Sequence, residues 1–252
     1  MIDIRNVSKS YGPARVVDDL SLRLPAGGLT AIIGPNGAGK STLLSMVARL
    51  LAPDSGRITV DGLDVNTTPG PVLAKRLAIL KQANEMALRL TVAELVAFGR
   101  FPHSRGRPTA QDREKIAEAI GYVDLAGLAD QPIDEMSGGQ RQRAFIAMVL
   151  AQDPACLLLD EPLNNLDMKH AAATMRLLRR AADELGKTVV VVIHDINFAA
   201  CHADRIVALK AGRLCFAGTP DELMRPEVLR AIYDMDVRVY EVDGMRLGAY
   251  YR

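Results

Sequence analysis

Two short segments of the chain carry residues suited to phosphate and metal chemistry. The first spans positions 34–42 and matches the pattern G-x-x-x-x-G-K-[ST] of a phosphate-binding loop. Glycines let the backbone curl so that successive N–H groups point at one anion, and a helix N-terminus adds a favourable partial positive charge. We therefore expect this segment to bind the phosphates of a nucleotide through Gly34, Pro35, Asn36, Gly37, Ala38, Gly39, Lys40, Ser41 and Thr42.

Two side chains of this loop have separate expected roles. Lys40 should reach the β- and γ-phosphates, and the hydroxyl of Ser41 should bind Mg²⁺. The loop lies between an apolar run at 29–33 and a helix predicted over 39–51, which is the context that the motif requires. A glycine-rich turn before a helix is the alternative interpretation, and the full motif in this context argues against it.

The second segment places two carboxylates after an apolar run, Cys156-Leu-Leu-Leu-Asp160-Glu161. Asp160 would hold Mg²⁺ directly or through water, and Glu161 would polarise an attacking water as a general base. An apolar strand that ends in Asp-Glu is weak evidence alone. Together with a phosphate loop it indicates nucleotide hydrolysis.

Two further polar residues follow predicted strands. His194 comes after the run 188–193 and could donate to the γ-phosphate, orient the water, or have only a structural role. Gln82 comes after the run 77–80 and could contact Mg²⁺ or water, although a single glutamine carries little signal. The histidines at 103, 170 and 202 are interpreted as surface residues.

The elements that must position these residues alternate between strand and helix. The continuous apolar runs at 155–159 and 188–193 are typical of buried parallel strands. Asp243-Gly244 between the runs 237–242 and 245–250 predicts a hairpin. Other strands are expected at 2–7, 20–24, 29–33, 57–60, 77–80 and 205–209, and helices at 39–51, 92–98, 112–125, 139–151, 169–185 and 196–203. The pattern predicts an α/β core with antiparallel strand at each end and a helical insertion in the middle.

Composition excludes several classes of protein. The 252 residues include 31 Lys+Arg against 30 Asp+Glu, a balance that argues against a dedicated nucleic-acid binder. The longest apolar run, 144–151, is far shorter than the about 20 residues of a membrane span. The N-terminus has no apolar leader, so we expect a cytoplasmic chain. Three scattered cysteines predict neither a disulfide framework nor a zinc site.

A further segment, Met136-Ser137-Gly138-Gly139-Gln140, opens the helix predicted over 139–151. Ser137 has the character of an N-cap, and the two glycines let a phosphate approach the helix N-terminus. Alone this could be a capped helix start. With the other motifs in order, the chain resembles the ATP-binding cassette (ABC) family over nearly its whole length.

The resemblance implies the fold. It is that of a P-loop NTPase cassette with a RecA-like core, an antiparallel β subdomain and a helical subdomain. Residues 1–252 would form a single ABC ATPase domain, with the core at about 1–84 and 155–252 and the helical subdomain at about 85–154.

The resemblance also implies roles for individual residues. Tyr11 matches the aromatic residue that stacks on adenine, Gln82 the glutamine of the hinge loop, and His194 the switch histidine. Asp167 ends the loop 164–167 that follows the metal strand. The segment Ser137, Gly138, Gly139 and Gln140 matches the family signature. Metal contacts would come from Ser41, Gln82 and Asp160.

Assembly is likewise implied only by the resemblance. In the family, two cassettes form a head-to-tail homodimer. ATP with Mg²⁺ lies in the phosphate loop of one subunit and is covered by the signature of the other. Partners would be two multi-span membrane permease subunits and an external substrate-binding protein, without nucleic acid. The ATPase would be peripheral, at the cytoplasmic face of the bacterial inner membrane.

Four segments narrow the resemblance to the ATPases of ferric siderophore importers: 161–170, 98–103, 141–153 and 194–198. Haem and cobalamin importers share the architecture and stay as alternatives. A soluble cassette ATPase of DNA repair or translation is disfavoured, since long coiled-coil insertions, a second cassette and basic tails are missing. Met136 replaces the usual Leu, and Leu163-Asn164-Asn165 replaces the commoner Thr-Ser-Ala.

A membrane subunit would contact the helical insertion near 85–107. That stretch includes a small basic cluster, Arg100, Arg105 and Arg107, for which a solvated loop is the alternative interpretation.

Overall fold

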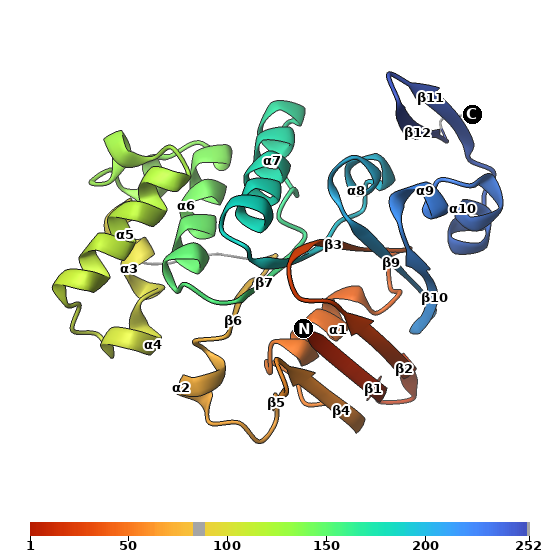
Figure 1. Cartoon of the computed structure of the whole chain (residues 1–252), viewed down its shortest axis with the longest axis horizontal. Coiled ribbons are helices and arrows are strands. Elements are labelled where there is room, and N and C mark those ends of the chain that lie inside the picture. The colour runs from red at the N-terminus through yellow and green to blue at the C-terminus, as the bar shows by residue number, and fades with distance from the viewer. Residues whose placement is uncertain (83–88, 251–252) are drawn as a thin grey trace.

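A computed structural model describes residues 1–82 and 89–250, and within them a central sheet separates two groups of helices (Figure 1). Its strand order is β10-β9-β3-β8-β7-β6. All neighbours pair parallel except β10, which is antiparallel to β9. The strands are β3 (Gly28–Ile33), β6 (Leu77–Leu80), β7 (Cys156–Asp160), β8 (Thr188–Val192), β9 (Arg205–Lys210) and β10 (Arg213–Gly218).

A second, antiparallel sheet has the order β2-β1-β4-β5 and lies on the far side of helix α1 (Lys40–Val47) from the central sheet (Figure 1). Its strands are β1 (Ile2–Tyr11), β2 (Ala14–Leu24), β4 (Ser55–Val60) and β5 (Leu63–Asp64). A two-stranded hairpin, β11 (Arg238–Val242) and β12 (Met245–Ala249), packs on helix α8 (Ile196–His202) near the C-terminus.

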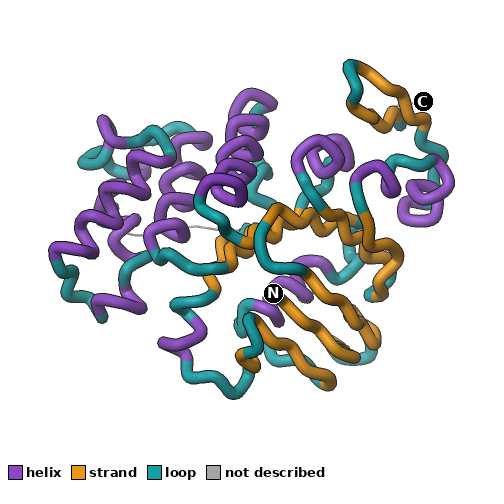
Figure 2. The backbone as a smooth tube through the Cα atoms, in the orientation of Figure 1, coloured by secondary structure: helices purple, strands orange, loops and turns teal. Residues whose placement is uncertain are grey.

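Helices α3 to α6 form a group of their own at one end of the molecule, whereas α9 and α10 lie at the opposite end (Figure 1 and Figure 2). The helices are α1 (Lys40–Val47), α2 (Gly70–Leu73), α3 (Val92–Phe98), α4 (Phe101–Ser104), α5 (Ala110–Tyr122), α6 (Gly138–Ala151), α7 (Met168–Glu184), α8 (Ile196–His202), α9 (Pro220–Leu223) and α10 (Pro226–Tyr233). The 3₁₀ turns found in the described part of the chain are η1 (Ala126–Leu128) and η2 (Ile133–Glu135). In the described residues, no helix combines the length and apolarity of a membrane span.

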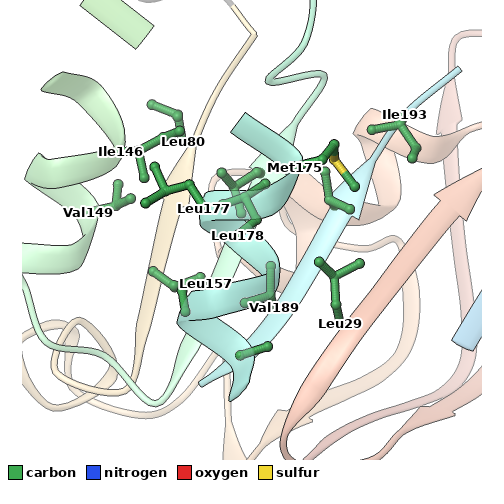
Figure 3. Packing of buried hydrophobic residues seen from close by; sticks show 14 of the residues in the cluster. Leu29, Leu80, Ile146, Val149, Leu157, Met175, Leu177, Leu178, Val189 and Ile193 are labelled. Carbon is green, nitrogen blue, oxygen red and sulfur yellow. The ribbon is translucent and has the colours of Figure 1, made fainter. Parts of the chain in front are cut away.

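Strands β7 and β8 are buried on both faces, which explains their continuous apolar sequence. Leu157 and Val189 belong to the core under α6 and α7 (Figure 3). Their neighbours Leu158 and Val190 point to the other face, into the core around α1 and the antiparallel sheet. Each central strand is thus held from both sides, and its C-terminal end is positioned by two cores.

The strands and helices predicted between residues 2 and 209 are all present, although several of their ends differ; helix α1, for example, ends at Val47 rather than Leu51. The hairpin around Asp243-Gly244 is present as well. The strands β5 and β10 and the helices α2, α4, α9 and α10 were not predicted. Strand β1 runs to Tyr11 rather than Val7, and β2 begins at Ala14 rather than Leu20. After Val7 the pairing of β1 with β2 shifts in register, so the apolar residues no longer alternate regularly along the strand. The sequence pattern therefore did not indicate that β1 continues to Tyr11.

The basic cluster expected at 100–107 is not a cluster on the surface. Arg100 is buried, and its Nε donates to Oδ1 of buried Asp112 at 2.8 Å. Its Nη1 donates to the carbonyl of Ala151 at 2.8 Å. Asp112 also accepts from the backbone and hydroxyl of Thr109. Arg100 therefore ties the start of α5 to the end of α6, while only Arg105 and Arg107 stay exposed.

Replacing Asp112 by Asn should lower thermal stability in a pH-dependent way. Hydrogen bonds from Thr109, and then from Arg100, lower the pKa of Asp112 from 3.8 to about 2. A depressed carboxyl pKa stabilises the fold above the unfolded-state pKa, and the stabilisation disappears as pH falls through the folded-state value. Asp112→Asn also leaves the Arg100 guanidinium buried without its partner, so the unfolding midpoint should fall by roughly 5 °C or more at neutral pH.

Thermal unfolding from about pH 7 down to about pH 2.5 checks this, and the gap between variant and wild type should narrow toward the acid end. Asp236→Asn is the matched control, because that carboxylate is exposed in its pair with Arg230. A gap that stays constant with pH would contradict the linkage.

Candidate active site

The loop at 34–42 connects the end of β3 to the start of α1, as its motif predicts. Gly39 is the N-cap of α1 and has φ of 95°, in the left-handed region. A Cβ at this position would lie 2.5 Å from the carbonyl oxygen of Val16. The loop is therefore pressed against the start of β2, and only glycine fits there.

Lys40 lies inside this loop and is 5% exposed. Its Nζ donates to the carbonyl oxygens of Gly34 at 2.8 Å and Pro35 at 3.0 Å. Burial lowers the pKa of Lys40, and the carboxylates of Glu161 and Asp160 act in the opposite direction. The ammonium is thus held at the centre of the loop, where it can meet a phosphate oxygen.

Asp160 ends β7 beside the first turn of α1. The hydroxyl of Ser41 donates to its Oδ1 at 2.8 Å. Burial raises the pKa of Asp160, which means that the charged carboxylate is poorly solvated. A hydroxyl and a desolvated carboxylate side by side are oxygen ligands of the kind that Mg²⁺ prefers. The residues present therefore fit a magnesium ion.

Glu161 is held by two neighbours. Nε2 of His194 lies 2.7 Å from its Oε1, and the amide of Asn164 donates to its Oε2. Its backbone has φ of 50°, and its N–H donates to the carbonyl of Val192 at 3.0 Å. A non-glycine residue in this conformation is uncommon, and such strain is often found at active sites. The turn aims the carboxylate away from the strand and toward His194.

These groups enclose a cavity of about 180 Å³. It brings together the phosphate loop, the start of β2, and the residues that follow β7 and β8. The lining residues are Val16, Asn36, Gly37, Ala38, Gly39, Lys40, Ser41, Thr42, Glu161 and His194. Asp160 is connected to this cavity through the hydrogen bond that it accepts from the hydroxyl of Ser41, a lining residue.

Other predicted site residues lie outside this cavity. Tyr11 is half exposed at the end of β1, and Gln82 is exposed two residues after β6. Ser137 caps α6, where its hydroxyl accepts from the N–H of Gln140 at 3.3 Å. Asp167 caps α7 and accepts from the N–H of His170 at 2.8 Å. Within one chain, the phosphate loop, the end of β7 and His194 therefore lie together. The signature residues 137–140 lie apart from them.

Two contributions were missed by sequence reasoning. Val16 lines the cavity although it carries no chemical signal, since its place depends on how β2 folds over the loop. The bond from Asn164 to Glu161 was missed too. The sequence signal for this bond was the segment Leu163-Asn164-Asn165, which replaces the commoner Thr-Ser-Ala. An amide at position 164, three residues after Glu161, can reach that carboxylate across one turn.

Comparison with known families decides where this arrangement belongs. The family model described as "ABC transporter" matches residues 17–164, which is more than half of the chain. The chain belongs to the ABC transporter family. Its fold is the ABC cassette, and the chain is an ATP-binding ABC transporter ATPase.

Similar ABC transporter subunits align over most of the chain. The petrobactin import ATP-binding protein YclP of Bacillus subtilis (strain 168) is 51% identical over 251 residues, covering 100% of both chains. The ferric enterobactin transport ATP-binding protein FepC of Escherichia coli (strain K12) is 41% identical over 227 residues, covering 89% of this chain and 84% of FepC.

A solved ABC cassette dimer in a post-hydrolysis state, bound to ADP and phosphate, superposes with a TM-score of 0.77 and 34% identity. The match covers 87% of this chain and 99% of that one.

Proposed function

We propose that this chain is the ATP-hydrolysing subunit of an importer for iron(III)-siderophore complexes. The observation that carries the ATPase chemistry is the juxtaposition of Lys40, the Ser41–Asp160 pair and Glu161 around one cavity. The substrate class is supported by full-length similarity to a petrobactin import protein and by similarity to a ferric enterobactin transport protein.

Each residue of the cavity has a separate task in hydrolysis. Backbone N–H groups of the loop and the Lys40 ammonium bind the β- and γ-phosphates and stabilise the charge that develops there. Glu161 accepts the proton of the attacking water, and His194 and Asn164 keep its carboxylate oriented. Ser41 and Asp160 would hold Mg²⁺, with Gln82 approaching when the site closes. Bound Mg²⁺ would neutralise phosphate charge.

A second copy of the chain completes this site in the proposal. Ser137 and Gly138 are exposed and do not line the cavity of their own chain. Head-to-tail pairing would bring them, with Gly139 and Gln140, over the ATP of the partner, and Asp167 would lie at the contact. The similarity to a cassette solved as a dimer with ADP and phosphate supports this arrangement. Tyr11 would stack on adenine at the outer end of the site.

The permease subunits would contact the group of helices α3 to α6. Phe98 is 51% and Phe101 is 60% exposed, and the charged residues Arg105 and Arg107 follow them. Apolar rings beside exposed cations suit a short helix of a permease subunit, and residues 85–88 of the expected contact region lie outside the described residues. The ATPase would sit at the cytoplasmic face of the bacterial inner membrane, with two permeases and an external binding protein.

Uptake of labelled substrates by the complete transporter tests the substrate class. Membrane vesicles or proteoliposomes that contain this chain, its permeases and the binding protein are offered ferric catecholate and hydroxamate siderophores, haem and cobalamin. We expect ATP-dependent uptake of a ferric siderophore, and none when Lys40→Ala replaces the wild type. Uptake of haem or cobalamin without uptake of any ferric siderophore would contradict the proposal.

A further inference from the structure

The two adjacent glycines of the signature have different surroundings in the isolated chain. A Cβ on Gly139 would lie 2.5 Å from both Cγ and Nδ1 of His170, closer than real Cβ atoms come to other atoms. A Cβ on Gly138 would meet nothing within 4 Å among the residues that the structure describes. Gly139 therefore faces its own chain, and Gly138 faces open space.

His170 connects this glycine to the loop before α7. Its backbone N–H donates to Oδ1 of Asp167 at 2.8 Å, and its Nε2 lies 3.9 Å from Oδ2 of the same carboxylate. About a third of its side chain is exposed, and the ring extends from the first turn of α7 onto the first turn of α6 at Gly139. The first turn of α6 and the loop before α7 would both lie at the proposed dimer contact. They thus touch each other through the imidazole of His170.

We propose that His170 is a positioning residue whose ring supports the first turn of α6 through Gly139. This rests on the proposed dimer, in which that turn covers the ATP of the partner. The ring determines how closely α6 approaches α7, and so where Ser137, Gly138 and Gly139 present their donors. Donors that stabilise charge in a transition state act only within a narrow range of distance. In this account, position 139 needs glycine because of its own chain, not because of the nucleotide.

Two substitutions that look equivalent in sequence should therefore have different effects. In Gly139→Ala the new methyl group meets the imidazole, so the first turn of α6 must move away from α7. In Gly138→Ala the methyl group enters open space and changes nothing inside the isolated chain. Removing the ring with His170→Ala makes room for a methyl group at 139 and does nothing for one at 138.

Variants in a Glu161→Gln parent test this, because ATP-driven dimerisation can then be measured without turnover. Gly139→Ala should weaken dimerisation about tenfold or more, since small misplacements of donors have large effects. The double variant Gly139→Ala/His170→Ala should recover most of that loss. Gly138→Ala is the matched control, and His170→Ala should not improve it. If His170→Ala leaves the Gly139→Ala defect unchanged, the nucleotide itself requires the glycine and the inference is wrong.

Two further measurements separate positioning from general stability. ATP binding by the isolated subunit should be unchanged in every variant, because the phosphate loop is not touched. With Glu161 intact, His170→Ala should lower kcat severalfold, and His170→Phe, which keeps a flat ring, should retain more than half of it. Wild-type kcat and dimerisation in His170→Ala would overturn the inference and leave the proposed function standing. A Glu161→Gln parent that never dimerises with ATP would overturn both.

Discussion

A Glu161→Gln variant should bind ATP as the wild type does and hydrolyse it about 10³-fold more slowly, the size of effect typical of a lost general base. The amide matches the carboxylate in shape, so the contacts with His194 and Asn164 can persist in altered form. It cannot take the proton of the attacking water at neutral pH. The phosphate loop and the Ser41–Asp160 pair are unchanged, so the affinity for ATP should stay close to that of the wild type.

Three measurements check this prediction: steady-state phosphate release, binding of a fluorescent ATP analogue, and size-exclusion chromatography with ATP. We expect the variant to accumulate as an ATP-bound dimer, because the step that would reopen it is blocked. Glu184→Gln is a suitable control, since that carboxylate lies on the exposed end of α7, away from the cavity. Hydrolysis by Glu161→Gln at the wild-type rate would show that another group is the base.

The parts of this site that were predictable are those encoded within a few consecutive residues. The loop at 34–42 determines its own conformation through its glycines and the helix that follows. The buried strand before Asp160 is predictable because a parallel strand covered on both faces needs apolar residues throughout. Asp160 and Glu161 are the first charged residues after the apolar run, and they are therefore expected at the end of the strand.

What could not be predicted depends on contacts between distant segments. Arg100 was predicted to belong to a surface cluster, either at the contact with a membrane subunit or in a solvated loop, and only its packing against α6 shows that it is buried with Asp112. His170 looked like a surface histidine, because nothing in its neighbourhood in the sequence reveals that Gly139 lies against its ring. The elements β10 and α10 were not predicted although they are as long as β9 and α1, which were predicted. Residues of α9 and α10, Leu223, Leu229 and Ile232, pack into the same core as the central strands, a contact between segments distant in the sequence.

Replacing Ser137 by Arg should abolish turnover and leave ATP binding by the isolated subunit intact. Ser137 is exposed at the N-terminus of α6 and contributes nothing to the lining of its own cavity. An arginine there removes the cap of α6, which costs about 0.5–2 kcal/mol. It also places a long cationic side chain on the surface that, in the proposed dimer, covers the ATP of the partner. The steric effect on pairing should dominate, because the cap is only locally important.

Ser137→Ala separates the two contributions, since it removes the cap without adding bulk. We expect it to retain partial turnover and to share any loss of thermal stability seen in the arginine variant. Mixing Ser137→Arg with an excess of Lys40→Ala subunits gives a sharper result. In a mixed dimer the intact phosphate loop of the first variant faces the intact signature of the second, so one of the two sites is complete. Activity that is restored on mixing supports a site shared between subunits. Loss of ATP binding by isolated Ser137→Arg subunits would mean instead that Ser137 acts on the nucleotide of its own chain.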